Sequence, residues 1–430
     1  MLGLGATFLI KTSSERSEMK SQHRVVLSQS KFRRLLLSRT ISNFGNGMAP
    51  TALAFSIFAL PDGNASTLSL VLTAQAIPLV IMLPIGGVLA DRIGRARMIA
   101  VMDIILSAVI FTMAYLFWSG NSFDGNPPIW MLVVLSAISG VLNALWYPAF
   151  PGLPADLLEE KYLQTANSYL AFGSNAAIIF GAAAGGFLVS QVSGAFAIAV
   201  DALTFLVAGL LVWGLRHTSS RATESESVIK ELHDGWKVFW SYKWVVVVVA
   251  SFTLIVMAMR ATDGVLGPLV AKDEFDGAVT WSQLISMEGV GLLIGAIIGV
   301  KWRPKRPMVM MMIAAYPIGI YMLLLSGPAA LTVLFIGAVM MGIGLELTWI
   351  FWSTALQSNI PKESIGRVAA YDAFGSVLFG PVGLAIAGPL AEKFGPQPIL
   401  IGAGVLVIVM VTLSLFNRDI RNLRGIEATS

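Results

Sequence analysis

Twelve long apolar segments constrain this chain more than any other feature of its sequence. A helix needs about 20 mostly apolar residues to cross the hydrocarbon core of a bilayer. Segments of that kind occupy residues 35–60, 68–90, 98–118, 129–150, 165–189, 194–214, 244–270, 281–300, 307–326, 330–354, 367–391 and 396–416. The sequence therefore predicts an all-α integral membrane protein with twelve transmembrane helices.

Composition supports the same class of protein. Of the 430 residues, 56% are hydrophobic and only 13% are charged, whereas a soluble domain carries roughly 25% charged residues. A single soluble core could not bury this much apolar surface, but a lipid bilayer can solvate it. The chain has no cysteine, which excludes disulfides and thiolate metal sites. We expect no metal and no cofactor.

Lysine and arginine indicate the orientation of the spans, because they accumulate on the cytoplasmic side of a membrane protein. With both termini in the cytoplasm, 26 of the 29 basic residues fall at cytoplasmic positions. An odd number of spans would destroy this asymmetry. The sequence therefore predicts that both termini are cytoplasmic.

A polar stretch from Arg216 to Lys243 divides the spans six and six. The predicted domains are a tail at 1–34, a first half at 35–214, a linker at 215–243, a second half at 244–416 and a tail at 417–430. Apolar residues recur at helical spacing in the linker, from Ile229 to Trp240, which is typical of an amphipathic helix at the membrane interface. The first residues lack the pattern of a signal peptide, and the sequence leaves open whether translation starts at Met1 or Met19.

The two halves are related by an internal repeat. Residues 169–174 read YLAFGS and residues 371–376 read YDAFGS, an offset of 202 that needs no gap across spans 4–5 and 10–11. Two six-helix halves built as parallel repeats are typical of transporters that rock one half against the other. Glycines four apart allow close helix packing in lipid. We expect such interfaces at Gly181, Gly185, Gly291, Gly295, Gly299 and Gly383.

The short loop after span 2 carries the most specific motif. It reads GGVLADRIGRAR from Gly86 to Arg97, and it resembles the loop signature G-x-x-x-D-R-x-G-R-[RK]-[RK] of the major facilitator superfamily. The matching residues are Gly87, Asp91, Arg92, Gly94, Arg95 and Arg97. The resemblance covers residues 30–416 and implies two pseudo-symmetric six-helix halves. Within the family the chain is similar to the bacterial branch of the enterobactin exporter and actinobacterial multidrug exporters, which implies a bacterial cytoplasmic membrane.

The resemblance gives the loop a role in gating. In the family this loop contacts the other half near the start of span 11 while the cavity faces outward. We expect Asp91 to act as a latch there, because an anion stabilises the positive N-terminus of a helix. The equivalent loop of the second half, from Gly299 to Arg306, has no aspartate. Span 5 also departs from the antiporter pattern G-P-x-x-G-G, because Ala182 stands where the proline would be.

Ionisable residues inside spans are costly and are candidates for function. They are Asp103, Asp201, Arg260, Asp263, Glu288 and Glu346. The resemblance puts spans 1, 4, 7 and 10 around the cavity and spans 3 and 6 at the periphery, so we expect structural hydrogen bonds at Asp103 and Asp201. Arg260 and Asp263 could form an outer charge pair. As proton carriers we expect Glu346 first, Glu288 second and Asp263 as a further candidate, although each carboxylate could instead be tied to a neighbouring polar group.

The cavity helices offer few polar groups among many aromatic ones. The substrate-cavity candidates are Asn43, Asn46, Asn143, Trp146, Tyr147 and Trp349. A mostly apolar, aromatic pocket suits hydrophobic or amphipathic ligands. No Gly-Lys pair occurs, which excludes the phosphate-binding loop of an ATP-driven pump, and no clustered catalytic set indicates an enzyme.

We therefore expect a secondary transporter that exports small hydrophobic or amphipathic compounds, such as drugs, in exchange for protons. The alternatives are a narrow exporter of a siderophore or metabolite, and a solute importer of the same fold. The expected partners are a small-molecule substrate, protons and the lipid bilayer. We expect a monomer with no nucleic-acid partner.

Overall fold

The structure, a computed structural model, is helical throughout the part of the chain that it describes. It describes residues 23–119, 127–215, 236–237, 239–302, 304–327, 329–361, 364, 368, 371–372, 375–376 and 378–423. Within these residues, ten helices are long and apolar enough to cross a membrane. Helices also occupy the first predicted span, which is more polar, and the described part of the eleventh.

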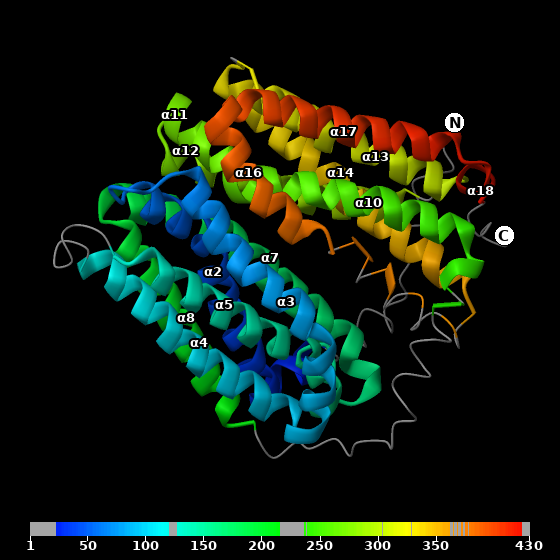
Figure 1. Cartoon of the computed structure of the whole chain (residues 1–430). Helices are drawn as coiled ribbons and strands as arrows, with labels where there is room; N and C mark the ends of the chain where they lie inside the picture. Colours follow the sequence, from blue (N-terminus) through cyan, green and yellow to red (C-terminus); the bar gives the residue numbers. More distant parts are fainter. Residues whose placement is uncertain are drawn as a thin grey trace, which may run out of the picture.

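The first half is a bundle of six long helices (Figure 1). They are α2 (Ser30–Phe58), α3 (Ala65–Ile93), α4 (Arg95–Trp118), α5 (Ile129–Trp146), α7 (Glu160–Gln191) and α8 (Gly194–Trp213). A 3₁₀ turn, η2 (Tyr147–Ala149), and the short helix α6 (Leu153–Leu157) connect α5 to α7. Helix α2 packs against both α7 and α8.

The second half is built in the same way, except that its first span contains a π-helical turn. That span runs through α10 (Lys243–Ala261), the π-helical turn η3 (Thr262–Leu266) and α11 (Gly267–Glu274). The other helices are α12 (Ala278–Lys301), α13 (Pro307–Leu325), α14 (Leu331–Asn359), α16 (Gly380–Phe394), α17 (Pro396–Phe416) and the short α18 (Arg418–Asn422). The sequence predicts one span at 244–270, and the structure has one span at Lys243–Glu274, with a π-helical turn that the sequence does not indicate.

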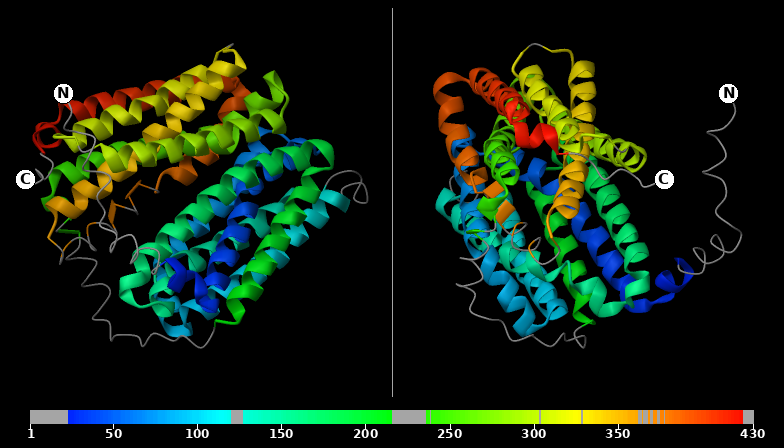
Figure 2. Two further views of the ribbon diagram at one scale, coloured as in Figure 1. Left: turned by 180° about the vertical axis from the view of Figure 1, so that it is seen from behind. Right: turned by 90° about the vertical axis from the view of Figure 1, so that its right-hand side faces the viewer.

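The two halves meet at one end of the molecule. We call the end where α2 begins and α17 ends the proximal end, and the opposite end the distal end. Figure 1 shows the bundles close together distally, near α11 and α16, and diverging proximally, and the view from behind in Figure 2 agrees. Helix α3 packs against α16, and α7 packs against α12, across the boundary between the halves.

Among the described residues, two hydrogen bonds join the halves at the distal end, and Oγ of Ser286 in α12 also donates to the carbonyl of Ile179 in α7 (3.4 Å). The backbone N–H of Ser66 donates to Oε1 of Glu392 (2.8 Å), and the backbone N–H of Gly388 donates to Oγ of Ser69 (2.7 Å). A side chain at Gly388 would collide with the backbone of Ala65. The distal closure therefore depends on close backbone approach as well as on these bonds.

Glycines bring helices together within each half. A side chain at Gly181 would collide with the carbonyl of Phe44 in α2, and one at Gly383 would collide with the carbonyl of Met257 in α10. Gly291, Gly295 and Gly299 of α12 all face α14. Small residues let helix backbones approach closely where no hydrophobic effect drives association.

Only part of the predicted linker helix can be compared with the structure. Residues 236–237 and 239–241 are helical, and Trp236 and Phe239 both contact Tyr371 at ring distances of 5.5 and 5.8 Å. Residues 216–235 and the outermost parts of both tails lie outside the described residues, so the predicted domain boundaries stay predictions. Residues 23–28 are helical, within the predicted N-terminal tail.

Candidate functional site

A cavity of about 450 Å³ lies between the two halves. Its walls come mainly from α2, α3, α4, α5 and α8 of the first half, and η3 and α16 of the second half close the remaining side. Apolar side chains dominate the lining, among them Leu53, Leu72, Leu79, Ile110 and Leu384. A volume of this size can hold a drug-sized ligand.

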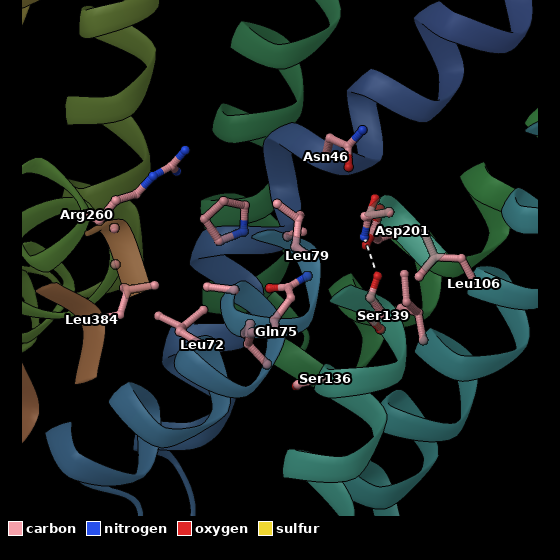
Figure 3. A pocket seen from close by; sticks show the side chains of 18 of the residues that line it. Asn46, Leu72, Gln75, Leu79, Leu106, Ser136, Ser139, Asp201, Arg260 and Leu384 are labelled. Carbon is pink, nitrogen blue, oxygen red and sulfur yellow. Dashed lines mark hydrogen bonds between the residues drawn. The ribbon is translucent and has the colours of Figure 1, made fainter. Parts of the chain in front are cut away.

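Most polar groups of the cavity lie on the side of the first half, while Arg260 and Asp263 line it from the second half. Figure 3 shows Asn46, Ser139 and Asp201 on the side of the first half, and Arg260 and Leu384 on the opposite side. Asn143 also lines the cavity, and its side-chain amide donates to the carbonyl of Ser139 (2.8 Å). The cavity therefore has neutral polar groups and Asp201 on the side of the first half, Arg260 and Asp263 on the side of the second, and mostly apolar side chains between them.

Asp201 differs from its predicted role. Its side chain lines the cavity and is only 3% exposed, yet Oδ1 has no hydrogen-bond partner among the described residues. Its own carbonyl accepts a bond from Thr204 (2.7 Å), but this bond does not involve the carboxylate. Span 6 is thus not purely peripheral, because one face of α8 reaches the cavity beside α2.

Asp103 has the structural role that the sequence predicts, and its partner is a residue that the prediction missed. Nη2 of Arg39 lies 2.7 Å from Oδ2 of Asp103, and both side chains are buried. The Arg39 guanidinium also lies over the Trp146 ring at 4.7 Å, and Trp146 stacks on Phe150 at 5.4 Å. Arg39 lies near the start of the predicted span 35–60. A basic residue at that position is usually interpreted as a cytoplasmic residue at the end of a span.

The sequence analysis also does not predict the role of one carboxylate, Asp372. Asp372, in the YDAFGS copy of the repeat, accepts a hydrogen bond from the indole Nε1 of Trp352 (2.7 Å) and one from Ser376 (3.4 Å). Its position inside predicted span 11 was the available signal. Trp352 contacts Trp244 at a ring distance of 5.6 Å, so this bond belongs to the core of the second half.

Arg260 and Asp263 line the second half's side of the cavity but do not form a close ion pair. No salt bridge within 4.0 Å joins them, although their charges interact at longer range. The π-helical turn begins at Thr262, between the two residues, and it alters the i,i+3 spacing that would bring them together in an α-helix. Glu288 is a further electrostatic neighbour of Asp263.

The expected proton carriers do not line the cavity itself, apart from Asp263. Glu288 and Glu346 lie on α12 and α14, at the interface that the glycines of α12 form. A side chain at Gly295 would meet Cβ of Glu346, and one at Gly342 would collide with the carbonyl of Glu288. The two carboxylates thus belong to one tightly packed pair of helices in the second half.

Three of the six substrate-cavity candidates line the cavity, namely Asn46, Asn143 and Tyr147. Asn43 instead donates a hydrogen bond to Ser174 (2.8 Å), and Trp146 packs on Arg39. Trp349 is 65% exposed on α14. Gln75, which lines the cavity from α3, was not predicted, because span 2 was not counted among the cavity helices.

The motif loop is a one-residue connection between α3 and α4. Gly94 alone separates the two helices, and its φ of 92° is a conformation that favours glycine. Nη1 of Arg95 lies 3.2 Å from Oδ1 of Asp156 in α6, so the loop is tied to the connection between spans 4 and 5. The side chains of Asp91 and Arg92 and the start of span 11 lie outside the described residues, so the latch stays a prediction.

Two helical bundles with a cavity between them, and ten long apolar helices among the described residues, are typical of a membrane transporter. The family model of the Major Facilitator Superfamily matches residues 35–384. This match covers most of the chain, so the chain belongs to that superfamily. It is a transporter and not an enzyme.

Curated relatives come from several bacteria and span nearly the whole chain. An uncharacterised MFS-type transporter, YfiS of Bacillus subtilis, is 23% identical over 91% of this chain and 94% of its own. Macrolide efflux protein A of Streptococcus pyogenes is 25% identical over 85% and 91%. The multidrug efflux pump Tap of Mycolicibacterium fortuitum is 24% identical over 90% and 96%.

Among solved structures, the nucleoside transporter NupG has a similar fold. A crystal structure of a point mutant of NupG superposes with a TM-score of 0.75 over 90% of this chain and 100% of that chain, at 13% sequence identity. This similarity shows a shared fold. It carries no information about the substrate of this protein.

Proposed function

We propose that the protein is a proton-coupled exporter of small hydrophobic or amphipathic compounds. The observation that carries the proposal is the cavity between the two halves, whose wall is mostly apolar with a few polar groups. A sugar or organic-acid carrier needs a polar lining matched to its substrate, whereas this lining suits loosely recognised apolar ligands. The macrolide and multidrug efflux proteins among the relatives support export.

The proposed mechanism is alternating access by rocking of the two halves. The predicted topology puts the proximal end in the cytoplasm, and distal closure across α3–α16 and α7–α12 then corresponds to a cavity that faces inward. Opening the distal end and closing the proximal end would release the substrate outside. We propose that the protein works as a monomer in the bacterial cytoplasmic membrane.

Proton coupling is assigned to the carboxylates of the second half. Asp263 reaches the cavity from the π-helical turn and interacts electrostatically with Glu288, and Glu346 lies on the partner helix of α12. A buried carboxylate that changes its exposure between two conformations can bind a proton on one side and release it on the other. This arrangement separates coupling in the second half from the polar groups on the first half's side of the cavity.

Dye efflux from cells that express the protein tests the proposal. We expect efflux of a lipophilic fluorescent dye above the empty-vector level, and we expect a protonophore to abolish it. Glu346→Gln and Glu288→Gln are the matching variants, because both keep the side-chain shape and remove the charge. Unchanged uphill efflux in both variants would contradict the coupling assignment.

A narrow exporter of a siderophore or metabolite is the second candidate, and an importer of the same fold is the third. Arg260 favours the second candidate, because this exposed cation lines the cavity and could bind an anionic group. No efflux across a broad panel of dyes would favour these candidates over the proposed multidrug exporter.

A further inference from the structure

The cavity side formed by the first half contains a carboxyl group that pairs with no charged residue of the described structure. Asp201 is almost fully buried, and its Oδ1 accepts no hydrogen bond from the described residues. No ion pair within 4.0 Å and no charged neighbour is found for it among those residues. A buried charge without a partner is costly and is rarely retained without a role.

Asp103 and Asp201 differ in whether a cation compensates the carboxylate. Both are aspartates buried among helices of the first half, and they are 1% and 3% exposed. Asp103 has the Arg39 guanidinium at 2.7 Å, so its charge is compensated within the protein. Asp201 has no such partner among the described residues, and it lines a cavity that can admit one.

The surroundings of Asp201 make space for a carboxylate. Gly45 of α2 faces it, and a side chain at Gly45 would collide with Oδ1 of Asp201 and Oγ1 of Thr204. The polar groups that share this side of the cavity, Asn46, Ser139 and Asn143, are all neutral. Arg260 is the one basic residue in the described lining, and it lies on the opposite side (Figure 3).

We infer that Asp201 is the binding site for the positively charged group of an amphipathic substrate, whose apolar body occupies the cavity between Leu72, Leu79 and Ile110. This inference rests on the proposed export function and adds the charge of the substrate to it. A cation in this position would neutralise the carboxylate in a water-poor site, where the attraction between charges is strong. A neutral ligand of the same shape would leave that charge uncompensated.

Binding of two probes with similar shape and different charge tests the inference. Tetraphenylphosphonium is a lipophilic cation, and triphenylphosphine oxide is a neutral molecule of related shape. The full chain is purified in detergent, and binding of each probe is measured by isothermal titration calorimetry. We expect wild type to bind the cation, and we expect Asp201→Asn to weaken that binding at least about tenfold, a change well above measurement error. We expect binding of the neutral probe to change by less than about twofold.

Two further variants separate a local role from a loss of folding. Asp201→Glu keeps the charge and should retain preference for the cation. Glu159→Gln removes an exposed carboxylate that pairs with Lys161 outside the cavity lining, and it should leave both affinities unchanged. Elution volume and thermal unfolding of each variant show whether it is folded.

Each outcome either supports or overturns a stated part of the inference. Equal binding of the cation by wild type and by folded Asp201→Asn would overturn the inference and leave the export proposal intact. Binding of the neutral probe alone by wild type would overturn the assigned substrate charge. If wild type binds neither probe and transports neither in proteoliposomes, both the export proposal and the inference are wrong.

Discussion

Arg39 compensates the charge of the buried Asp103 carboxylate inside the first half. Removing one member of a buried ion pair leaves an uncompensated charge and costs about 3–5 kcal/mol of folding free energy. We therefore expect Arg39→Met to lower the stability of the protein strongly, with additional loss from its contact with Trp146. Thermal unfolding in detergent, followed by intrinsic tryptophan fluorescence, measures this effect.

The double variant Arg39→Met with Asp103→Leu is the control. Replacing a whole buried pair by apolar residues of similar volume is often neutral for stability. We expect the double variant to recover most of the unfolding temperature that the single variant loses. A single variant as stable as wild type would show that the pair does not compensate a buried charge.

Individual residues were the part of the site that the sequence predicted least well. Arg39 and Lys31 look alike in sequence, because a basic residue near the cytoplasmic end of a span satisfies the positive-inside rule in either case. The sequence analysis placed Asp201 at the periphery because it placed the whole of span 6 there. The direction of the Asp201 side chain depends, however, on how α8 packs against α2. Such directions follow from tertiary packing and not from local spacing.

At the scale of elements, the turn between α3 and α4 depends on Gly94. Its φ of 92° is unfavourable for any residue with a side chain and costs about 1–3 kcal/mol when occupied by one. No atom lies within 4 Å of the position that a Cβ would take, so the cost comes from the backbone alone. We expect Gly94→Ala to lower the unfolding temperature.

Gly402 in α17 is the matched control for this prediction. A Cβ at Gly402 also meets no atom within 4 Å, but the residue lies in a helix without a positive φ. Alanine is favoured over glycine inside helices, so Gly402→Ala should leave stability unchanged or raise it. Equal effects of the two substitutions would show that the conformation of Gly94 is not what matters.

The helices themselves were predictable because a spanning helix requires a long apolar run, which is easy to recognise. Irregular turns within these helices were harder to predict. The π-helical turn at Thr262–Leu266 occurs in a sequence, TDGVL, that is also compatible with an ordinary helix. The packing of this turn against α3 and α16 decides that Asp263 and Gly264 turn toward the cavity.

At the scale of the whole molecule, Glu392 joins the two halves at the N-terminus of α3. A carboxylate near a helix N-terminus contributes about 0.3–1 kcal/mol at an exposed site. We therefore expect Glu392→Gln to shift the population toward a distally open state by about two- to fivefold. The change should alter the balance between conformations without unfolding the protein.

Spin labels can measure this shift. Because the sequence has no cysteine, Val192→Cys and Phe394→Cys supply one label in each half at the distal end, where both side chains are exposed. Double electron–electron resonance then gives the distance distribution. Glu274→Gln is the control, since Glu274 accepts a bond from Gln397 at the same end but within one half (2.6 Å). A distribution that changes equally in both variants would contradict the role of Glu392.

The overall architecture followed from the sequence more completely than the site did. The six-plus-six division and the repeat around Tyr169 and Tyr371 predicted two similar bundles, and the superfamily match confirms this fold. No single segment of the sequence determines whether the bundles close at the proximal or at the distal end. The closed end depends on contacts such as Ser69 with Gly388, which join residues 319 positions apart.

The unequal share of the two halves in the cavity wall has a consequence for how such a protein can diversify. The first half supplies five of the helices that surround the cavity, while the second supplies α10 with its π-helical turn and α16. Substitutions that broaden or narrow the range of accepted molecules can therefore accumulate in the first half while the second stays unchanged. The two halves, which are related by an internal repeat, would then accumulate substitutions at different rates.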